Sequence, residues 1–402
     1  MYLKVTHSEN KDRKRILFLT SRFPWPLEKG DKLRAYHFIK ALSLKADIYL
    51  FAINETYPSQ EQLQALVPYC KEIKCCRVSK FDSVLSVAGA LIKSIPFQAA
   101  YFYNSGAVRE LKKFIASFPV DAMFCHLLRM GPYAASINIH PSVIDYMDAF
   151  SKGMERYAAT APFWIKPAAA AETRRLAVYE RELFDQFDSH TVISAQDRDC
   201  IAHPDKSDIV VLPNGVDLEY YSPMDIPKKQ ELIFLGNMAY APNIASVNYA
   251  VRKILPELDK LIPGCRLLIA GATPGKEVLD LASDRVMITG WLDDVRESMA
   301  SSCVMIAPML ISIGLQNKIL QAMSMKIPCV VSSLANNAIG AVHNESILVA
   351  DTPAEYAAQI ARLLRDEQLR LRIAENAHVF VRQNFSWDAA VGILYRELGI
   401  NN

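Results

Sequence analysis

The chain has 402 residues, 51% of them hydrophobic, and its 45 basic and 43 acidic residues leave a formal net charge of +2. This length suits two or three domains, and this apolar content is enough for buried cores, so extensive disorder is excluded. The near balance of charge argues against a dedicated nucleic-acid binder, and we expect no nucleic-acid partner.

The spacing of the cysteines and the length of the longest apolar run indicate the cellular compartment and argue against a membrane span. The 8 cysteines include no C-x-x-C pair, which argues against a zinc site or a disulfide framework and favours a reducing, cytoplasmic location. The polar N-terminus lacks the apolar core of a signal peptide. Residues 84–92 are apolar, but they are far fewer than the roughly 20 residues that a bilayer crossing requires.

The stretch after this run is aromatic and then basic. Residues 97–103 carry four aromatic side chains, and Arg109, Lys112 and Lys113 follow. Two alternatives remain for this stretch, an amphipathic segment at a membrane surface and a core helix with a solvated basic face.

Short apolar runs alternate with longer helical patterns in both halves of the chain. In the first half they cover residues 15–20, 47–51, 121–125, 142–145, 191–193 and 209–212. In the second half they cover residues 231–236, 266–271, 286–288, 303–306 and 329–331. Nearly continuous Val, Ile and Leu runs are typical of strands covered by helices on both faces, so the sequence predicts an α/β fold with two doubly wound domains.

A polar segment marked by prolines, residues 213–228, is predicted to link the two domains. We therefore expect an N-terminal domain at residues 1–212, a second domain at 229–382 and a C-terminal segment at 383–402. Helical spacing of apolar residues predicts helices over 353–364 and 369–381.

The most informative segment follows the apolar run 303–308. A helix is predicted to open at Gly314 with Lys318 in its first turn. Free backbone N–H groups, the helix dipole and a lysine together suit a phosphate group, at the carboxyl ends of strands where open α/β sheets bind ligands. An ordinary solvated lysine is the alternative.

In the second half, two predicted strands end at glycines, Gly236 and Gly271, and a further turn contains Gly290. They allow a close approach of the backbone to a ligand or a tight turn, and both explanations stay open. Neither G-x-G-x-x-G nor G-x-x-x-x-G-K-[ST] is present, so the fingerprints of Rossmann dehydrogenases and P-loop hydrolases are absent.

Together, five segments resemble one family, the GT-B glycosyltransferases, and in particular the large retaining group called family 4 and a bacterial exopolysaccharide-associated subgroup. They are the loop and helix at 21–37, the PNGVD sequence at 213–217, the F-x-G-x-M sequence at 234–238, the turn at 289–296 and the G-x-Q-N-K sequence at 314–318. The resemblance implies two Rossmann-like domains facing a central cleft, with the segment 383–402 returning to the N-terminal domain.

The resemblance also implies a nucleotide-diphosphate sugar as donor. The residues expected to bind it are Gly30, Gly236, Asn237, Gly290, Trp291, Leu292, Gly314, Leu315, Gln316, Asn317, Lys318 and Gln321. The base is expected near the turn at 290–293, and the diphosphate near Gly236 and Lys318. Lys318, His126 and Asp31 are expected to act in catalysis. Donors aimed at the developing charge can lower such a barrier by a few kcal/mol.

Several roles stay open. His126 contacts the sugar or acceptor, or it is a structural histidine. Asp145 and Asp148 are further polar candidates, and no residue is assigned as a covalent nucleophile. No D-x-D lies in a suitable loop, so we expect neither a metal nor another cofactor.

The chain departs from the family pattern in three places. The family carries two glutamates with seven residues between them, and here these positions hold Ile313 and Gln321. A glutamine lacks the charge that strengthens a bond to a ribose hydroxyl. No arginine or lysine follows the strand ending at Gly236. Lys326 stands where a glycine is usual.

The sequence therefore predicts a cytoplasmic glycosyltransferase, peripheral on the inner face of the membrane. It would transfer a sugar, with retention of configuration, to a cell-surface glycan or a lipid-linked precursor. A GT-B nucleotide-sugar epimerase and a catalytically impaired nucleotide-sugar-binding homologue are the alternatives.

Overall fold

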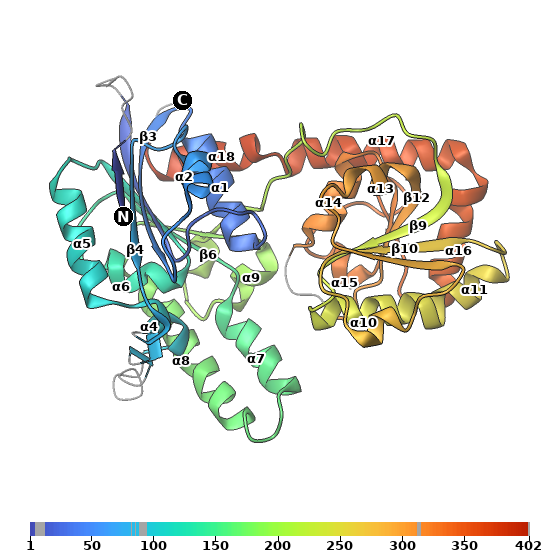
Figure 1. The fold of residues 1–402 in the computed structure, drawn as a ribbon, viewed down its shortest axis with the longest axis horizontal. Coiled ribbons are helices and arrows are strands. Elements are labelled where there is room, and N and C mark those ends of the chain that lie inside the picture. Colours follow the sequence, from blue (N-terminus) through green and yellow to red (C-terminus); the bar gives the residue numbers. More distant parts are fainter. Residues whose placement is uncertain (5–12, 82, 85, 88–94, 312–314, 401–402) are drawn as a thin grey trace. The chain divides into compact units, whose positions relative to one another are not determined.

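The computed structural model describes residues 1–4, 13–81, 83–84, 86–87, 95–311 and 315–400 (Figure 1). The chain divides into two compact units. Unit 1 comprises residues 1–213 and 390–402, and unit 2 comprises residues 214–389.

Unit 1 is built on an eight-stranded sheet with the order β1-β4-β3-β2-β5-β6-β7-β8. Its strands are β1 (Tyr2–Lys4), β2 (Lys14–Thr20), β3 (Ala46–Asn54), β4 (Glu72–Arg77), β5 (Ala122–His126), β6 (Ser142–Met147), β7 (Ser189–Val192) and β8 (Val210–Val211). All neighbours pair in parallel except β1 and β4. The six runs predicted for this half are confirmed as strands, whereas β1 and β4 were not predicted.

The helices of unit 1 lie between these strands. They are α1 (Gly30–Leu42), α2 (Gln60–Leu66), α4 (Phe97–Phe102), α5 (Ser105–Ala116), α6 (Gly131–Ala134), α7 (Phe150–Thr160), α8 (Lys166–Phe184) and α9 (Ala195–Cys200), with short 3₁₀ turns at Leu128–Met130 and Lys206–Asp208. The last helix, α18 (Trp387–Glu397), brings the C-terminal segment to unit 1. There the Tyr395 hydroxyl donates to the Ala41 carbonyl at 2.9 Å.

Helix α5 answers one question that the sequence left open. Its side chains Ala107, Leu111 and Phe114 are buried in the core of unit 1. Its basic residues Arg109 and Lys112 lie on the exposed side. For α5 itself the core-helix alternative fits, because its apolar face is covered by protein.

Unit 2 has a six-stranded sheet, order β11-β10-β9-β12-β13-β14, whose paired neighbours are all parallel. Its strands are β9 (Lys229–Leu235), β10 (Arg266–Ala270), β11 (Val286–Gly290), β12 (Ser302–Ala307), β13 (Cys329–Val331) and β14 (Leu348–Val349). The five runs predicted for this half are confirmed. Strand β12 is buried along its whole length, as a central strand covered on both faces should be.

The helices of unit 2 are α10 (Ala241–Tyr249), a π-helical turn at Ala250–Ile254, α11 (Leu255–Asp259), α12 (Lys276–Leu279), α13 (Arg296–Ser301), α14 (Asn317–Ser324), α15 (Ser333–Asn336), α16 (Pro353–Arg365) and α17 (Glu367–Asn384). The helix that was predicted to open at Gly314 begins at Asn317, with Lys318 in its first turn. Gly314 itself lies outside the described residues.

Each sheet has a topological switch point, where the strand order reverses and a crevice opens at the carboxyl ends of the strands. In unit 1 it lies between β2 and β5, and in unit 2 between β9 and β12. Over the described ranges of the chain, no helix is both long and apolar enough to span a membrane.

Candidate functional site

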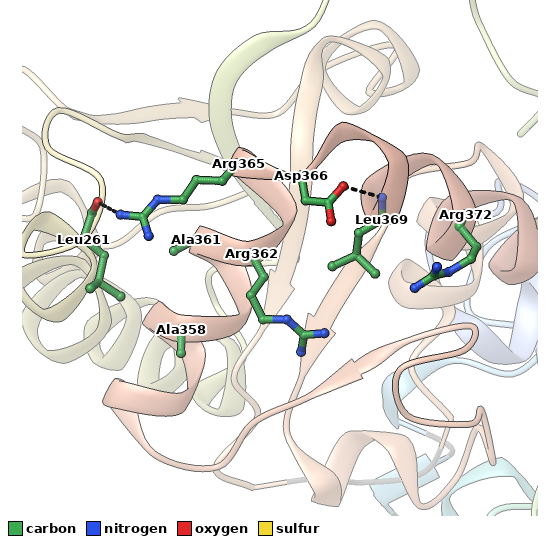
Figure 2. Close-up of a pocket in the computed structure, with 8 residues that line it drawn as sticks. All are labelled: Leu261, Ala358, Ala361, Arg362, Arg365, Asp366, Leu369 and Arg372. Carbon is green, nitrogen blue, oxygen red and sulfur yellow. Dashed lines mark hydrogen bonds between the residues drawn. The ribbon is translucent and has the colours of Figure 1, made fainter.

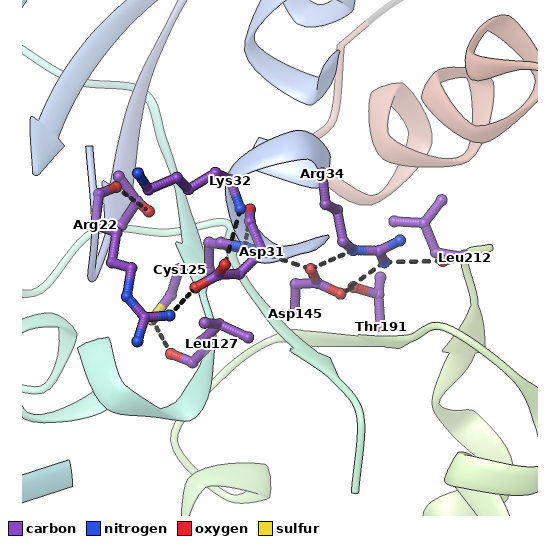
Figure 3. Close-up of polar contacts among 11 residues, drawn as sticks. Arg22, Asp31, Lys32, Arg34, Cys125, Leu127, Asp145, Thr191 and Leu212 are labelled. Atoms are coloured by element: carbon purple, nitrogen blue, oxygen red, sulfur yellow. Dashed lines mark hydrogen bonds and ion pairs between the residues drawn. The ribbon is translucent and has the colours of Figure 1, made fainter. Parts of the chain in front are cut away.

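A buried ion pair lies at the switch point of unit 1. Arg34 of α1 donates from Nε and Nη2 to the two carboxylate oxygens of Asp145, at 2.7 and 2.8 Å, and both side chains are fully buried (Figure 3). Thr191 donates to the same carboxylate at 2.9 Å, and Arg34 also donates to the Leu212 carbonyl. Burial alone would raise the pKa of Asp145, but Arg34 and His126 more than offset it and hold that pKa well below its usual range.

His126 ends β5 and is fully buried between two acceptors. Its Nδ1 lies 3.0 Å from Asp145 Oδ2, and its Nε2 lies 3.0 Å from the Asp31 carbonyl oxygen. Both contacts are made to oxygen atoms inside unit 1, one on β6 and one at the start of α1. Both nitrogens are therefore used inside unit 1, where they tie the ends of β5 and β6 to the start of α1.

Asp31, in the first turn of α1, is bound by arginines. Arg22 donates to its carboxylate, and Arg129 Nη1 lies 4.0 Å from it. Burial would raise the pKa of Asp31, but the charge and hydrogen bond of Arg22, with smaller effects of His126 and Arg129, bring it below the ordinary value. Burial, followed by the charge of Arg22, lowers the pKa of Arg129 to about 10. Two guanidinium groups here share one carboxylate, which leaves a local excess of positive charge.

Two non-glycine residues at this edge have left-handed backbone angles. Leu127, directly after His126, has φ 70°, and Met147, at the end of β6, has φ 62°. Such conformations cost of order 1–3 kcal/mol each and are found preferentially at functional sites. Gly30 begins α1 beside this point, where an added Cβ would lie 3.3 Å from the Met147 methyl group.

Asp148 follows the strained Met147 and makes no side-chain hydrogen bond or ion pair with any residue that the structure describes. Burial, followed by the charge of Asp197, raises its pKa to about 7. A carboxyl group with a pKa near neutrality can exchange a proton at physiological pH, as a general acid or base must.

A cavity of about 410 Å³ lies within unit 1, and Arg22 is among its lining residues. Trp25, Tyr101 and Phe102 supply aromatic surface, and Glu28, Lys32 and Glu55 supply charge. The Ser21 hydroxyl, also in its lining, is buried and has no hydrogen-bond partner in the part of the chain that the structure describes. This mixture of aromatic and hydrogen-bonding groups is suited to a polar organic ligand such as a sugar.

In unit 2, the predicted lysine lies at the switch point. Lys318 Nζ donates to Asn243 Oδ1 at 2.7 Å and lies 4.4 Å from the centre of the Phe234 ring. Asn243 in turn donates to the Asn237 carbonyl at 2.9 Å. Burial lowers the pKa of Lys318 to about 7, and no carboxylate pairs with it among the described residues.

Gly236 packs closely against the side chain of Asn243. An added Cβ would lie 2.5 Å from Asn243 Nδ2 and would displace this amide, whereas a Cβ on Gly271 would lie 1.7 Å from the Gly236 carbonyl oxygen. Glycine is thus required at Gly271, for close backbone packing and for its φ of 150°.

The other predicted donor residues fall in three places. The side-chain oxygen of Asn237 accepts from the Thr273 hydroxyl and from the backbone amide of Ala239. Trp291 is 69% exposed beside Gly290 and Leu292, and its indole donates to Asp293 at 3.1 Å. The described part of the 314–321 segment lies along the start of α14, and it comprises Leu315, Gln316, Asn317, Lys318 and Gln321.

Two polar groups on α14 are notable within this segment. The Asn317 Oδ1 atom is buried and has no hydrogen-bond partner among the described residues. The Gln321 side chain makes no hydrogen bond to a described residue. Both are therefore available to a bound molecule, although the predicted weakening by glutamine at 321 stays a prediction.

Lys326 explains why glycine is usual at its position. It follows α14 with φ 57°, the left-handed conformation that ends many helices at a glycine. Its ammonium group pairs with Glu375 at 2.6 Å, at the surface.

A second cavity, of about 500 Å³, lies at the opposite edge of unit 2 (Figure 2). It is lined by the end of α16 and by Leu261, which shortly precedes β10, and helices in such folds run antiparallel to their strands. Its Arg362 and Arg365 donate to Asn344 and to the Leu261 carbonyl, as cations near a helix C-terminus often do. We assign no chemistry to it. In the part of the chain covered by the structure, no three His, Cys, Asp or Glu side chains are placed to hold a metal ion.

Comparison with known proteins identifies this arrangement. Residues 229–366 match the family model described as glycosyl transferases group 1. An uncharacterized 44.6 kDa protein in the cps region of Klebsiella pneumoniae is 20% identical, covering 95% of this chain and 99% of that protein. An Escherichia coli enzyme named UDP-Gal:alpha-D-GlcNAc-diphosphoundecaprenol alpha-1,3-galactosyltransferase is 24% identical, covering 58% of this chain and 65% of the enzyme.

Solved structures match nearly the whole chain. Anabaena HepE in complex with UDP superposes with a TM-score of 0.69 at 14% identity, covering 96% of this chain and 99% of HepE. Sucrose-phosphate synthase from Thermosynechococcus elongatus superposes with a TM-score of 0.67 at 15% identity, covering 96% and 99% of the two chains. The chain therefore has the two-domain GT-B fold that the sequence predicted, and its residues 229–366 are similar to the glycosyl transferases group 1.

Proposed function

We propose that this protein transfers a sugar from a nucleotide-diphosphate sugar to a cell-surface glycan or its lipid-linked precursor. The observation that carries the proposal is Lys318, a cation at the switch point of unit 2 that is desolvated and has no carboxylate partner in the described structure. Such a group is destabilising unless an anion binds to it. The diphosphate of the donor is the anion that a group 1 glycosyltransferase domain would bring.

The donor would bind along the ends of β9 and β11 and the start of α14. Gly236 would let the diphosphate approach the backbone, Asn243 holds the ammonium group of Lys318 in place, and the unpartnered Asn317 Oδ1 could accept from a hydroxyl. As the sugar leaves, negative charge builds on the diphosphate, and a fixed cation stabilises that charge. HepE was solved with UDP, so UDP-sugars are the first donors to test.

The acceptor would bind to unit 1. The cavity lined by Trp25, Tyr101 and Glu55 offers an aromatic surface and hydrogen-bonding groups for a sugar ring. Asp148, with a pKa of about 7, is the group we assign to receive the proton of the attacking hydroxyl. The Escherichia coli relative is named for a diphosphoundecaprenol-linked acceptor, which favours a lipid-linked acceptor here as well.

His126 and Asp31 are assigned positioning roles in place of the direct contact considered from the sequence. Both ring nitrogens of His126 are bound inside unit 1, one of them to the Asp31 carbonyl. The Asp31 carboxylate orients Arg22, whose guanidinium group lines the cavity. Their effect on the reaction would thus pass through the placement of Arg22 and of the Gly30 turn.

Retention of configuration is proposed from the resemblance to family 4, without a protein nucleophile. A location peripheral to the inner face of the membrane is part of the same proposal, because a lipid-linked acceptor is held there. Gln321 is the feature that favours the alternative of a homologue that binds a nucleotide sugar without turnover. No feature of the site favours an epimerase.

The proposal is tested by a thermal-shift screen of UDP-, GDP-, ADP- and CDP-sugars against the wild type and Lys318→Ala. A ligand at about 100 times its Kd adds roughly 2.7 kcal/mol to the free energy of unfolding. We expect one nucleotide class to stabilise the wild type and not the variant. Acceptor-dependent release of nucleoside diphosphate then separates transfer from binding alone, and no shift with any donor would overturn the proposal.

A further inference from the structure

The hairpin of α7 and α8 ends in an apolar tip that faces solvent. Helix α7 leaves the sheet directly after Asp148, and α8 returns from the tip to β7. Phe163 and Trp164, in the connection, are 79% and 68% exposed. Their rings are arranged edge to face, with the ring centroids 4.9 Å apart. Figure 1 shows this hairpin projecting away from the sheet of unit 1.

The sequence around the tip is nearly without charge. Residues 157–171 contain one charged side chain, Lys166, and no acidic one. Tyr157, one turn before the connection, is half exposed, and Pro162 and Pro167 are exposed beside the aromatic pair. Exposed apolar side chains that occur singly are normal on a protein surface, but a contiguous apolar end on a projecting element indicates a partner.

The hairpin is held at two places along α8, one around Glu172 and one at Glu180. Glu172 of α8 accepts from the Gln98 amide of α4 at 3.2 Å, and Arg175 lies 4.8 Å from the Phe97 ring. Near the other end of α7, Ser151 donates to the buried carboxylate of Glu180. The tip is therefore presented by a rigid support, about 16 Å from the start of α7 at a rise of 1.5 Å per residue.

We propose that this tip inserts into the interfacial region of a lipid bilayer and holds unit 1 against the membrane. Tryptophan and phenylalanine with an adjacent lysine are the side chains that this region selects, because the rings bury apolar surface while the ammonium group reaches the headgroups. A protein partner would be expected to meet a flatter patch with a polar rim, and residues 157–171 supply no such rim.

Lys166 fixes the expected lipid dependence. It begins α8, where the positive end of the helix dipole adds to its charge. Lys152, on α7, is already paired with Glu155 at 2.7 Å. Electrostatic attraction therefore rests on few charges, and anionic lipid should strengthen the binding without being its main source.

The role of the tip in placing the site near the bilayer rests on the proposed function, because it assumes a membrane-bound acceptor. Since α7 starts at the strand end that carries Asp145 and Asp148, the tip would set the distance between the bilayer and these carboxylates. A lipid-linked diphosphate sugar projects only its head group from the bilayer, so such an anchor would bring the site to its substrate.

The test is flotation of the whole protein, without any substrate, on vesicles of phosphatidylcholine alone or with 30% phosphatidylglycerol. We expect the wild type to float, Phe163→Ser/Trp164→Ser to bind at least tenfold more weakly to both vesicles, and Lys166→Gln to weaken binding a few-fold to the anionic vesicles only. Leu371→Ser, which alters a side chain 61% exposed on α17 of unit 2, is the matched control and should float like the wild type.

The outcomes are distinct from those of the donor screen. Flotation of the double variant like the wild type, or no flotation of the wild type, overturns the proposal. A wild-type dimer that the double variant converts to a monomer, without flotation of either, assigns the tip to a second copy of the chain and also overturns it. Unchanged melting and donor shifts in the double variant show that its fold and donor site are intact.

Discussion

The sharpest consequence of the donor site is a pH-dependent affinity that depends on Lys318. Burial lowers its pKa to about 7 in the free protein, whereas the diphosphate ester of a nucleotide sugar stays fully ionised from pH 6 to 9. The anion binds the protonated lysine and raises its pKa again, so binding takes up a proton above pH 7.

The magnitude follows from the protonated fraction. With a pKa of about 7, about nine tenths of the lysine is charged at pH 6 and about one hundredth at pH 9. The Kd should thus be nearly constant below pH 7 and rise tenfold per unit above it, to roughly ninety times its pH 6 value at pH 9. Isothermal titration calorimetry in two buffers of different ionisation enthalpy measures both the Kd and the proton uptake.

Lys318→Met removes the charge while keeping most of the volume. Losing a charge-assisted hydrogen bond of about 1.5–3 kcal/mol should weaken donor binding roughly 10- to 150-fold at pH 6, and the pH dependence above 7 should disappear. Lys229→Met, at the exposed opposite end of β9, is the matched control and should bind donor like the wild type.

The free energy of unfolding of the free protein should rise with pH, whereas its affinity for the donor falls. The folded protein binds fewer protons than the unfolded chain between pH 7 and the ordinary lysine pKa of 10.5, so wild-type stability should rise with pH in that window. The methionine variant should melt at a higher temperature than the wild type at pH 7 and lack this rise. A wild-type Kd that is constant from pH 6 to 9, or donor binding by Lys318→Met equal to the wild type, would refute the reasoning.

Three further predictions concern single residues. Asp145→Asn breaks the fully buried pair with Arg34 and leaves a buried cation, so urea denaturation should show a loss of about 3–5 kcal/mol; Glu155→Gln, at an exposed pair with Lys152, should stay within about 1 kcal/mol of the wild type. Asp148, with a pKa of about 7, must be ionised to accept a proton, so kcat/KM should fall as pH drops below 7, and Asp148→Asn should lower kcat about 10²- to 10⁴-fold and abolish that limb of the profile. Lys326→Gly and Lys326→Ala both lose the ion pair with Glu375, but only glycine relieves the left-handed backbone, so the glycine variant should be more stable by about 1–2 kcal/mol in chemical denaturation, and equal stabilities would contradict the assigned strain.

The strands were predictable wherever both faces of the sheet are covered, because burial on both faces requires uninterrupted apolar runs. Strand β4 was missed for the same physical reason. Its Glu72, Lys74 and Arg77 interrupt the pattern, since β4 is covered by the short, antiparallel β1 near the edge of the sheet. Edge strands commonly carry such charges, and an apolar-run criterion passes over them.

The sequence predicted several residues of the site but not the contacts that these residues make with one another. Lys318, Gly236, His126 and Asp31 were singled out from motifs, but the sequence held no signal for Arg34. An arginine inside a helix normally lies on the solvated face, and its partner Asp145 is 111 residues away in the chain. Only the order of β2, β5 and β6 in the sheet brings the two together.

The depressed pKa of Lys318 could not be read from the sequence either. It results from burial against Phe234 and Asn243, which the strand β9 and the helix α10 bring to the start of α14. The motif predicts a cation at that helix start, whereas the packing of three elements decides that burial lowers the pKa of this cation and that no carboxylate pairs with it in the described structure.

Both switch points contain groups that lower the free energy of unfolding of this chain. A buried arginine–carboxylate pair is often no more stable than apolar side chains of the same volume, yet one lies below His126, flanked by the left-handed Leu127 and Met147. A lysine with a lowered pKa lies at the corresponding edge of unit 2. A core that served packing alone would contain none of these groups, because each costs free energy that an apolar side chain or a glycine would save. They occur at the carboxyl ends of both sheets, where open α/β folds bind ligands, and this location supports the proposal that both edges form the site.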